Sequence, residues 1–252
     1  MISNRKKIIR NLLALVFWLA VWQGFALILA KPLLLPGPVE VVTRLFELAV
    51  TKDFWYFTAV SLGRIVLGVG AAILLGLGLA VLCCKSSLVD TLVAPLLITI
   101  KSTPVASFVI LVLIWVKRDY VPVLIAGLMV LPIIWANVCA GIRGTDKQLL
   151  EMAKVYKLSR GRVLKRIYVP SVMPHFHSAC RTALGFGWKS GVAAEVLTMP
   201  KHSIGRLIYE SKLYLQTTDL FAWTVVVILL SLLLEKVFLK FLDRRAFNVR
   251  AK

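Results

Sequence analysis

The stretch EMAKVYKLSRGRVLKRIYVP, residues 151–170, is a polar and basic interruption in a strongly apolar sequence. In and just before it, apolar residues recur at helical spacing while Lys and Arg fill the other faces, which is typical of amphipathic helices. These apolar residues are Leu149, Leu150, Ala153, Tyr156 and Leu158. Ser159 is of a type that caps helices, and Pro170 of a type that ends them. We therefore predict two short amphipathic helices, the second beginning at Ser159 and ending before Pro170.

The composition predicts a membrane protein. Of the 252 residues, 59% are hydrophobic and the mean hydropathy is +0.84, well above what a soluble domain needs. A membrane-spanning helix requires about 20 predominantly apolar residues. Six segments qualify, at about 12–30, 61–82, 92–116, 121–142, 177–198 and 220–242. The predicted fold class is an all-α integral membrane protein of about six transmembrane helices, forming one domain over residues 1–252.

The net charge of +19 would suggest a nucleic-acid partner in a soluble protein. Here Lys and Arg fall in the gaps between apolar segments, so their distribution indicates topology instead. They are densest before the first segment, at Arg5, Lys6 and Lys7, in the run from Arg143 to Arg166, and after the last segment. The positive-inside rule therefore predicts a multi-pass protein with both termini and the 151–170 loop in the cytoplasm.

The sequence does not predict a disulfide framework, a metal site or an ATP-binding site in this chain. Cys83, Cys84, Cys139 and Cys180 lie in or beside apolar segments without CxxC spacing, which predicts neither a disulfide framework nor a zinc site. His175 and His177 lack a third ligand nearby, so we expect no metal site. The phosphate-binding pattern Gly-x-x-x-x-Gly-Lys-Ser/Thr is absent from the sequence, so an ATP-driven transporter would need its ATPase on another chain.

The 151–170 stretch resembles the EAA loop of ABC importer permeases. The residues that match this pattern are Glu151, Ala153, Ile167 and Pro170, and those that depart from it are Met152, Lys157 and Val169. Lys157 stands where the family has glycine, which can adopt a left-handed turn that costs an L-residue about 1–2 kcal/mol. We therefore expect the turn between the two short helices to be placed differently here.

The resemblance extends beyond the loop and is strongest to the permeases for nitrate, sulfonates and taurine. It includes Ser61, Arg64 and Gly68 in the second segment, Thr103-Pro104 in the third, and Ala194-Glu195 in the fifth. It implies that residues of about 143–176 form a cytoplasmic coupling-helix loop that docks on a separate ABC ATPase. The ATPase-coupling residues it implies are Glu151, Ala153, Tyr156, Lys157, Leu158, Ile167 and Pro170.

The same resemblance implies the partners and the setting. Two copies of the chain would form a homodimer in the bacterial inner membrane, with cytoplasmic ATPase subunits and an extracytoplasmic solute-binding protein, and with no nucleic acid. ATP and Mg would bind the partner ATPase, so we expect this chain to be no enzyme and to carry no cofactor. The solute would be a small anion of the nitrate, sulfonate or taurine type.

Alternatives remain open for the solute and for the class of protein. The same machinery could import a vitamin precursor or another small organic solute. An ATP-independent carrier would usually show two related halves, and we detect no internal repeat. An integral membrane enzyme would be expected to show paired acids or a histidine constellation within the membrane, and the acids inside predicted spans, Glu195 and Glu235, fall in different spans.

Small residues at regular spacing predict where helices pack closely. Gly68, Ala72, Gly76 and Ala80 recur every fourth residue, so one face of the second span has almost no side chains. Ala183, Gly187, Gly191 and Ala194 form a similar face in the fifth segment. We expect other helices to approach both faces.

The fifth segment also carries a polar stripe that predicts a lining for the translocation pathway. Arg181, Gly185, Trp188, Val192 and Glu195 fall on one helix face. The alternative is that Arg181 and Glu195 extend to opposite membrane surfaces from the two helix ends. Lys189 and Lys101 are further pathway candidates, although Lys101 could instead extend to the inner interface.

Overall fold

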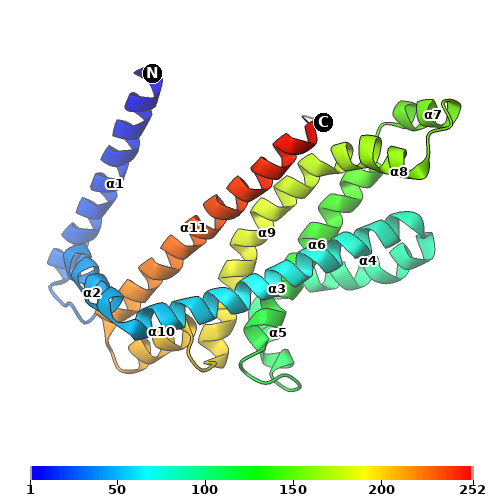
Figure 1. Ribbon diagram of the computed structural model, residues 1–252. Helices are drawn as coiled ribbons and strands as arrows, with labels where there is room; N and C mark the ends of the chain where they lie inside the picture. The colour runs from blue at the N-terminus through cyan, green and yellow to red at the C-terminus, as the bar shows by residue number, and fades with distance from the viewer. Residues whose placement is uncertain (1, 251–252) are drawn as a thin grey trace.

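The apolar segments form long helices because helices satisfy every backbone hydrogen bond internally, as the interior of a membrane requires. The computed structural model describes residues 2–250, and the side chains of residues 9–238 and of residue 240. Over these residues the regular structure is helical throughout (Figure 1). The basic residues predicted to set topology at both chain ends lie outside the described side chains.

The helices follow the predicted order. They are α1 (Ile2–Leu29), α2 (Pro38–Val50), α3 (Lys52–Lys85), α4 (Ser87–Ser102), α5 (Val105–Val112), α6 (Val121–Arg143), α7 (Lys147–Val155), α8 (Arg160–Val163), a π-helical turn (Leu164–Tyr168), α9 (Val169–Thr198), α10 (Ile204–Leu213) and α11 (Thr217–Arg250). In Figure 1 the N-terminal end of α1, the C-terminal end of α11 and α7 lie at the top, whereas α2 and α10 lie at the bottom. Both chain ends are therefore on the side of the molecule that carries α7.

Four helical segments of the described chain are long and apolar enough to cross a membrane. These are Ile9–Leu29 within α1, all of α3 and α6, and Thr217–Phe238 within α11. The pair α4 and α5 adds a fifth if it is taken as one broken span. Helix α9 covers the predicted fifth segment and is about 45 Å long at 1.5 Å per residue, but it is too polar to meet the same criterion. All six predicted segments are thus helical, and composition supports four or five of them as spans.

The third predicted span is broken at Thr103-Pro104. Helix α4 ends at Ser102, α5 begins after Pro104, and the two are bent by 107°. A proline keeps the residue before it out of the helical region, and Thr103 is accordingly extended, with φ −83° and ψ 134°. Pro95 lies inside α4 without ending it. Of the two prolines, Pro104 therefore makes the break.

Helices α3 and α9 both pack along α6, and these three form the main hydrophobic core. The small-residue face of α3 is buried against α6 at Gly68, Ala72, Gly76 and Ala80. A Cβ atom added to Gly68 would lie 2.1 Å from the carbonyl oxygen of Val123, and one added to Gly76 would lie 3.0 Å from Cβ of Ile134. Glycine is therefore required at Gly68 by the approach of two backbones.

The second small-residue face brings α9 to the same core. A Cβ atom at Gly187 would lie 2.7 Å from side-chain atoms of both Val130 and Val69, and one at Gly191 would lie 2.6 Å from Ile65. Trp188, only 1% exposed, donates from Nε1 to the carbonyl of Val227 at 3.0 Å. Trp188 thereby connects α9 with α11.

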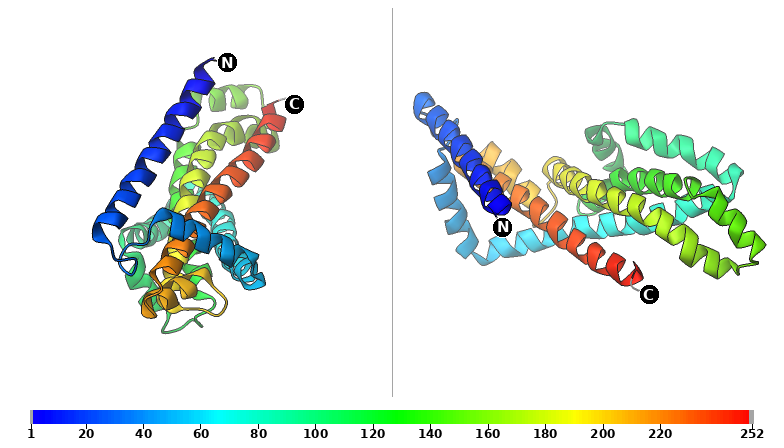
Figure 2. Two further views of the ribbon diagram at one scale, coloured as in Figure 1. Left: turned by 90° about the vertical axis from the view of Figure 1, so that its left-hand side faces the viewer. Right: turned by 90° about the horizontal axis from the view of Figure 1, so that it is seen from above.

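Helix α1 stands apart from this core (Figures 1 and 2). None of its membrane-spanning part is buried within the chain. It is held near its end by Trp22, whose Nε1 donates to the carbonyl of Pro36 at 3.1 Å and whose ring lies 5.8 Å from that of Phe221. The core is therefore complete without α1.

The close approach at Gly68 generates a prediction for folding. Gly68→Ala should destabilise the chain by about 1–3 kcal/mol, because the added methyl group meets backbone that cannot move aside. The matched control is Gly70→Ala on the same helix, where an added Cβ meets nothing within 4 Å. Alanine favours helix over glycine by up to about 1 kcal/mol, so the control should be neutral or stabilising. Unfolding by SDS in mixed micelles measures both, and equal behaviour of the two variants would contradict the packing argument.

Candidate functional site: the loop between α6 and α9

The polar stretch that begins near Thr145 projects from the core as α7 and α8 (Figure 1). Helix α7 begins at Asp146, whose carboxylate accepts a hydrogen bond from the backbone N–H of Gln148 at 2.8 Å. This is the usual way in which an Asp side chain caps a helix. At the base of the loop, Gly141 on α6 allows α9 to approach, because an added Cβ there would lie 3.1 Å from Cα of Val172. The loop is thus mounted on two closely packed helices.

The turn after α7 adopts the left-handed form that the sequence argued against. Lys157 has φ +48°, its N–H donates to the carbonyl of Lys154 at 3.0 Å, and the N–H of Leu158 donates to that of Ala153 at 2.9 Å. These two bonds define a Schellman motif, in which the residue after the C-cap is left-handed and is usually glycine. Our expectation that lysine would displace the turn is therefore wrong. The hydrogen bonds of the motif hold Lys157 in the conformation that glycine would adopt at lower cost.

The second short helix does not end at Pro170 as predicted. Helix α8, the π-helical turn and α9 run on without a break from Arg160 to Thr198. Proline lacks the N–H that a helix interior needs and its ring crowds the preceding turn. Here the N–H of Val169 bonds back to the carbonyl of Leu164, five residues earlier, and this wider π-helical register directly precedes Pro170. The π-helical register directly before Pro170 therefore accommodates the proline inside a continuous helix.

Ser159 occupies the N-cap position of α8, as predicted, without capping through its side chain. Its hydroxyl oxygen instead accepts a hydrogen bond from Nε of Arg162 at 3.2 Å. The start of α8 is thus organised by a side chain of its own first turn.

The residues predicted to couple to an ATPase divide into two groups. Ala153 and Ile167 are buried, at 4% and 5% exposure, and Leu158 is half-buried. Glu151, Tyr156, Lys157 and Pro170 are exposed. The first group holds the loop in shape, whereas the second is accessible to a partner.

Helix α7 and its C-cap present exposed apolar side chains, of which sequence reasoning assigned only Tyr156 to the site. Leu149, Met152 and Val155 recur every third residue and are 41%, 44% and 78% exposed, and Tyr156 beside them is 73% exposed. Residues at this spacing share one helix face. Counting which apolar positions lack a partner within the chain requires the structure, so the periodicity alone could not separate this face from the buried one.

Behind the loop lies a mostly apolar groove of about 480 Å³. Its walls come from the ends of α3 and α6 and from the α8–α9 segment: Leu77, Val81, Cys84, Lys85, Val138, Ile142, Leu164, Tyr168, Val169, Val172, Met173 and Phe176. Any movement of the π-helical turn or the start of α9 relative to α3 would therefore change this groove.

The predicted pathway residues are not brought together. Lys101 and Lys189 are exposed, and Arg181 is exposed with its Nε 3.9 Å from Oε1 of Glu235 on α11. Trp188 and Glu195 are 1% and 0% exposed. The polar stripe predicted the wrong surroundings for Trp188 and Glu195. Val192 on the same helix face packs into the core, so this part of the face is buried. We therefore withdraw Trp188 and Glu195 as pathway-lining residues.

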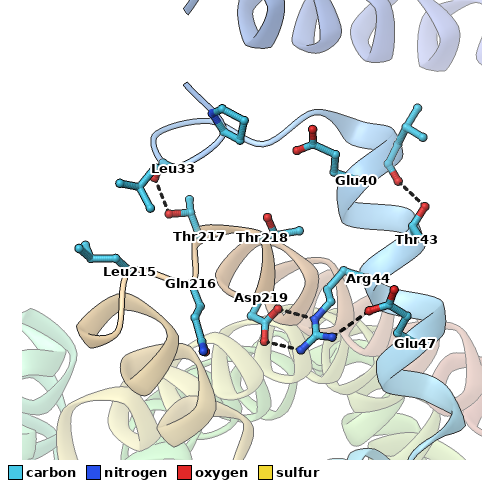
Figure 3. Close-up of a pocket in the computed structure, with 12 residues that line it drawn as sticks. Leu33, Glu40, Thr43, Arg44, Glu47, Leu215, Gln216, Thr217, Thr218 and Asp219 are labelled. Atoms are coloured by element: carbon cyan, nitrogen blue, oxygen red, sulfur yellow. Dashed lines mark hydrogen bonds and ion pairs between the residues drawn. The ribbon is translucent and has the colours of Figure 1, made fainter. Parts of the chain in front are cut away.

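At the opposite end of the molecule, a pocket of about 640 Å³ lies between α2 and the start of α11 (Figure 3). Arg44 on α2 donates from Nε to Oδ1 of Asp219 at 2.5 Å and from Nη2 to Oδ2 at 3.0 Å, and it also pairs with Glu47 at 2.8 Å. These hydrogen bonds, Asp219 first, raise the pKa of Arg44 above its ordinary value. The hydroxyl of Thr217 donates to the carbonyl of Leu33 at 2.5 Å. Sequence reasoning missed the pairing of Arg44 with Asp219 because these two residues are separated by 175 positions.

The left-handed turn at Lys157 generates a prediction for the loop. Lys157→Gly should stabilise it by about 1–2 kcal/mol, so the Leu158 amide should exchange with deuterium about tenfold more slowly. The matched control is Lys154→Gly within α7, which should speed the same exchange because glycine costs up to about 1 kcal/mol inside a helix. Faster exchange in Lys157→Gly would contradict the assigned turn.

The bidentate pair of Arg44 and Asp219 generates a prediction for the contact between α2 and α11. A double-mutant cycle with Arg44→Ala and Asp219→Ala should give a coupling free energy of unfolding of about 0.5–1 kcal/mol, reduced by high salt because Arg44 is partly exposed. The cycle of Arg44→Ala with Glu47→Ala serves as the control and should give less, since Glu47 is more exposed and its pair joins one helix to itself. Equal couplings would show that the link between α2 and α11 adds nothing.

Comparison with known proteins shows the family of this chain. A family model described as "Binding-protein-dependent transport system inner membrane component" matches residues 65–248. The chain is 26% identical over 220 residues to the taurine transport system permease protein TauC of Escherichia coli (strain K12), covering 85% of this chain and 80% of that protein. It is 25% identical over 236 residues to the putative aliphatic sulfonates transport permease protein SsuC of Bacillus subtilis (strain 168), covering 92% and 84%.

A solved structure supports the fold alone. It is a crystal structure of a bacterial ABC transporter involved in the import of the acidic polysaccharide alginate. One of its chains superposes with a TM-score of 0.56 at 19% identity, over 96% of this chain and 99% of that one.

Proposed function

Because the chain belongs to the family of binding-protein-dependent transport system inner membrane components, we propose that it is the permease subunit of an ATP-driven ABC importer. It spans the membrane several times and provides the helices between which solute passes. ATP hydrolysis in this family resides on a separate subunit, so the chain is not itself an enzyme. We place ATP and Mg²⁺ on that subunit and no cofactor on this chain.

The observation that carries the coupling role is the exposed apolar face of α7. Leu149, Met152, Val155 and Tyr156 lack partners sufficient to bury them within the described chain, and they lie on a helix that projects from the core. An amphipathic helix with a free apolar face suits a hydrophobic groove on another protein. We propose that α7 is the coupling helix and that the ATPase provides this groove. Glu151 and Lys157, also exposed, would lie at the rim of the contact.

We further propose a topology in which α7 and both termini are cytoplasmic, while α2 and α10 face outward. The dense positive charge between Arg143 and Arg166 supports this orientation. Such a topology requires α9 to cross the membrane as a sixth span, shielded by α3 and α6. All residues, 1–252, would then form one transmembrane domain that receives solute from an extracytoplasmic binding protein.

We propose that two identical copies form the transporter. Helix α1 has no buried part of its span in a single chain, and Lys101, Arg181 and Lys189 are exposed on helices that have apolar surroundings. A second copy would enclose charged side chains that lipid would not tolerate.

For the solute we propose a small anion of the sulfonate type. Taurine and aliphatic sulfonates are named for the two relatives above, and Lys101, Arg181 and Lys189 would give a pathway positive charge. Arg181 is partly balanced by Glu235, so Lys189 is the freer of the two charges on α9.

The proposal is tested by co-purification of the tagged chain with its ABC ATPase subunit. Met152→Arg and Val155→Arg should each reduce the retained ATPase by tenfold or more, because burying an unpaired charge costs several kcal/mol. Lys154→Glu, an exposed change on another face of α7, is the matched control and should retain it. Ala153→Arg is less suitable because Ala153 is buried.

Two results would count against the proposal. The first is that the native chain carries no ATPase through purification under any condition. The second is that both arginine variants retain the ATPase as well as the control does. Either result would remove α7 as the docking helix.

A further inference from the structure

Glu195 is an acid with no exposure to solvent, in the last turn of α9. Its Oε2 accepts two hydrogen bonds, from Oγ of Ser61 at 2.8 Å and from the backbone N–H of Gly205 at 3.1 Å. The Ser61 oxygen in turn accepts from the N–H of Ile204 at 2.9 Å. Three helices, α3, α9 and α10, therefore meet at one carboxylate.

The contact depends on a close approach of backbones. A Cβ atom added to Gly205 would lie 2.3 Å from Cβ of Glu195 and 2.6 Å from its carbonyl carbon. The backbone amides of Ile204 and Gly205 lie in the first turn of α10, so they have no acceptor within their own helix. A negative charge at this end of a helix is also favoured by the helix dipole. Glu195 thus fixes the start of α10 to the end of α9.

The connection between α9 and α10 is held in a costly backbone conformation. Met199 and His202 have φ of 48° and 53°, in the left-handed region that L-residues avoid. A second clamp holds this turn, because Oδ1 of Asp119 accepts hydrogen bonds from the N–H of Lys201 at 3.0 Å and from Nη2 of Arg64 at 3.3 Å. A turn under such strain keeps its shape only while the contacts around it persist.

Helix α9 links this outer contact to the opposite end of the molecule. The helical run from Arg160 to Thr198 is about 58 Å long at 1.5 Å per residue. It begins beside α7 and ends at Glu195, and α10 lies against the ends of α9 and α11 (Figures 1 and 2). A displacement at one end of such a run reaches α10 through the turn of residues 199–203 and through the contacts at Glu195.

We propose that Glu195 is a positioning residue for transport, fastening α10 to α9 so that displacement of the α7 loop moves the outer helix. This inference rests on the proposed function, because it takes the displacement to come from an ATPase bound at α7. Glu195 does not touch the solute in this role. It acts through α10, which covers the outer end of the core.

The test measures hydrogen–deuterium exchange in the complex of the full chain with its ABC ATPase, in lipid nanodiscs, with and without ATP and vanadate. In the native complex, trapping with ATP and vanadate should change exchange both in α7 and in α10. In Glu195→Ala, exchange in α10 should be about tenfold faster in both states, since two buried hydrogen bonds are lost. The nucleotide-dependent change in α10 should disappear, while that in α7 persists.

Two further variants separate coupling from simple stability. Glu195→Gln keeps an oxygen that can accept both hydrogen bonds and should retain the response in α10. Thr198→Val is the matched control, because the Thr198 hydroxyl is equally buried but bonds only to the carbonyl of Ala194 in its own helix. It should also retain the response. Should Glu195→Ala fail to assemble, Ser61→Ala removes one hydroxyl of the same contact and should reduce the response.

The outcomes are distinguishable from failure of the proposed function. If the ATPase does not alter exchange in α7 of the native chain, the proposed function fails. If α7 responds and α10 does not, or if Glu195→Ala and Ser61→Ala keep the full response in α10, the role of Glu195 is overturned. Equal loss of the response in Thr198→Val would overturn it too.

Discussion

The close approach of α3 and α9 to α6 is the constraint on which the rest of the structure depends. In lipid, helices gain little from excluding water from one another, so they associate through dense packing of small residues. Gly68 and Gly76 provide that packing on α3, and Gly187 and Gly191 provide it on α9. With both helices fixed against α6, the loop that leaves α6 and enters α9 has a fixed base. The α7–α8 loop and the hydrogen-bond network at Glu195 are therefore mounted on one packed unit.

Hydrophobicity and periodicity were sufficient to predict most of the fold. They located the helices of all six apolar segments, the amphipathic α7, and the small-residue faces, because these features repeat within a short stretch of sequence. The turn at Lys157 and the continuous helix through Pro170 were predicted wrongly. In both places a local preference was overruled by hydrogen bonds, a Schellman motif in the first and a π-helical register in the second.

The contacts of Glu195 and of Arg44 were less predictable than the fold, because their partners come from distant parts of the chain. Glu195 was noticed as a rare acid within an apolar segment, yet its role follows from Ser61 and Gly205, which no pattern in α9 reveals. The bidentate pair of Arg44 and Asp219 was hidden for the same reason. Conversely, Arg181 and Lys189 remain exposed, so contacts within the single chain do not define their surroundings.

Helix α9 is too polar to count as a membrane span by composition, although the fold encloses it between α3, α6 and α11. A segment of this kind gains little by entering lipid on its own. During synthesis, α3 and α6 emerge from the ribosome before α9 and can already be paired through their glycine contacts when it arrives. In the proposed topology, in which α9 is the sixth span, the order of the helices along the chain lets the most polar one enter the membrane beside two helices that are already packed.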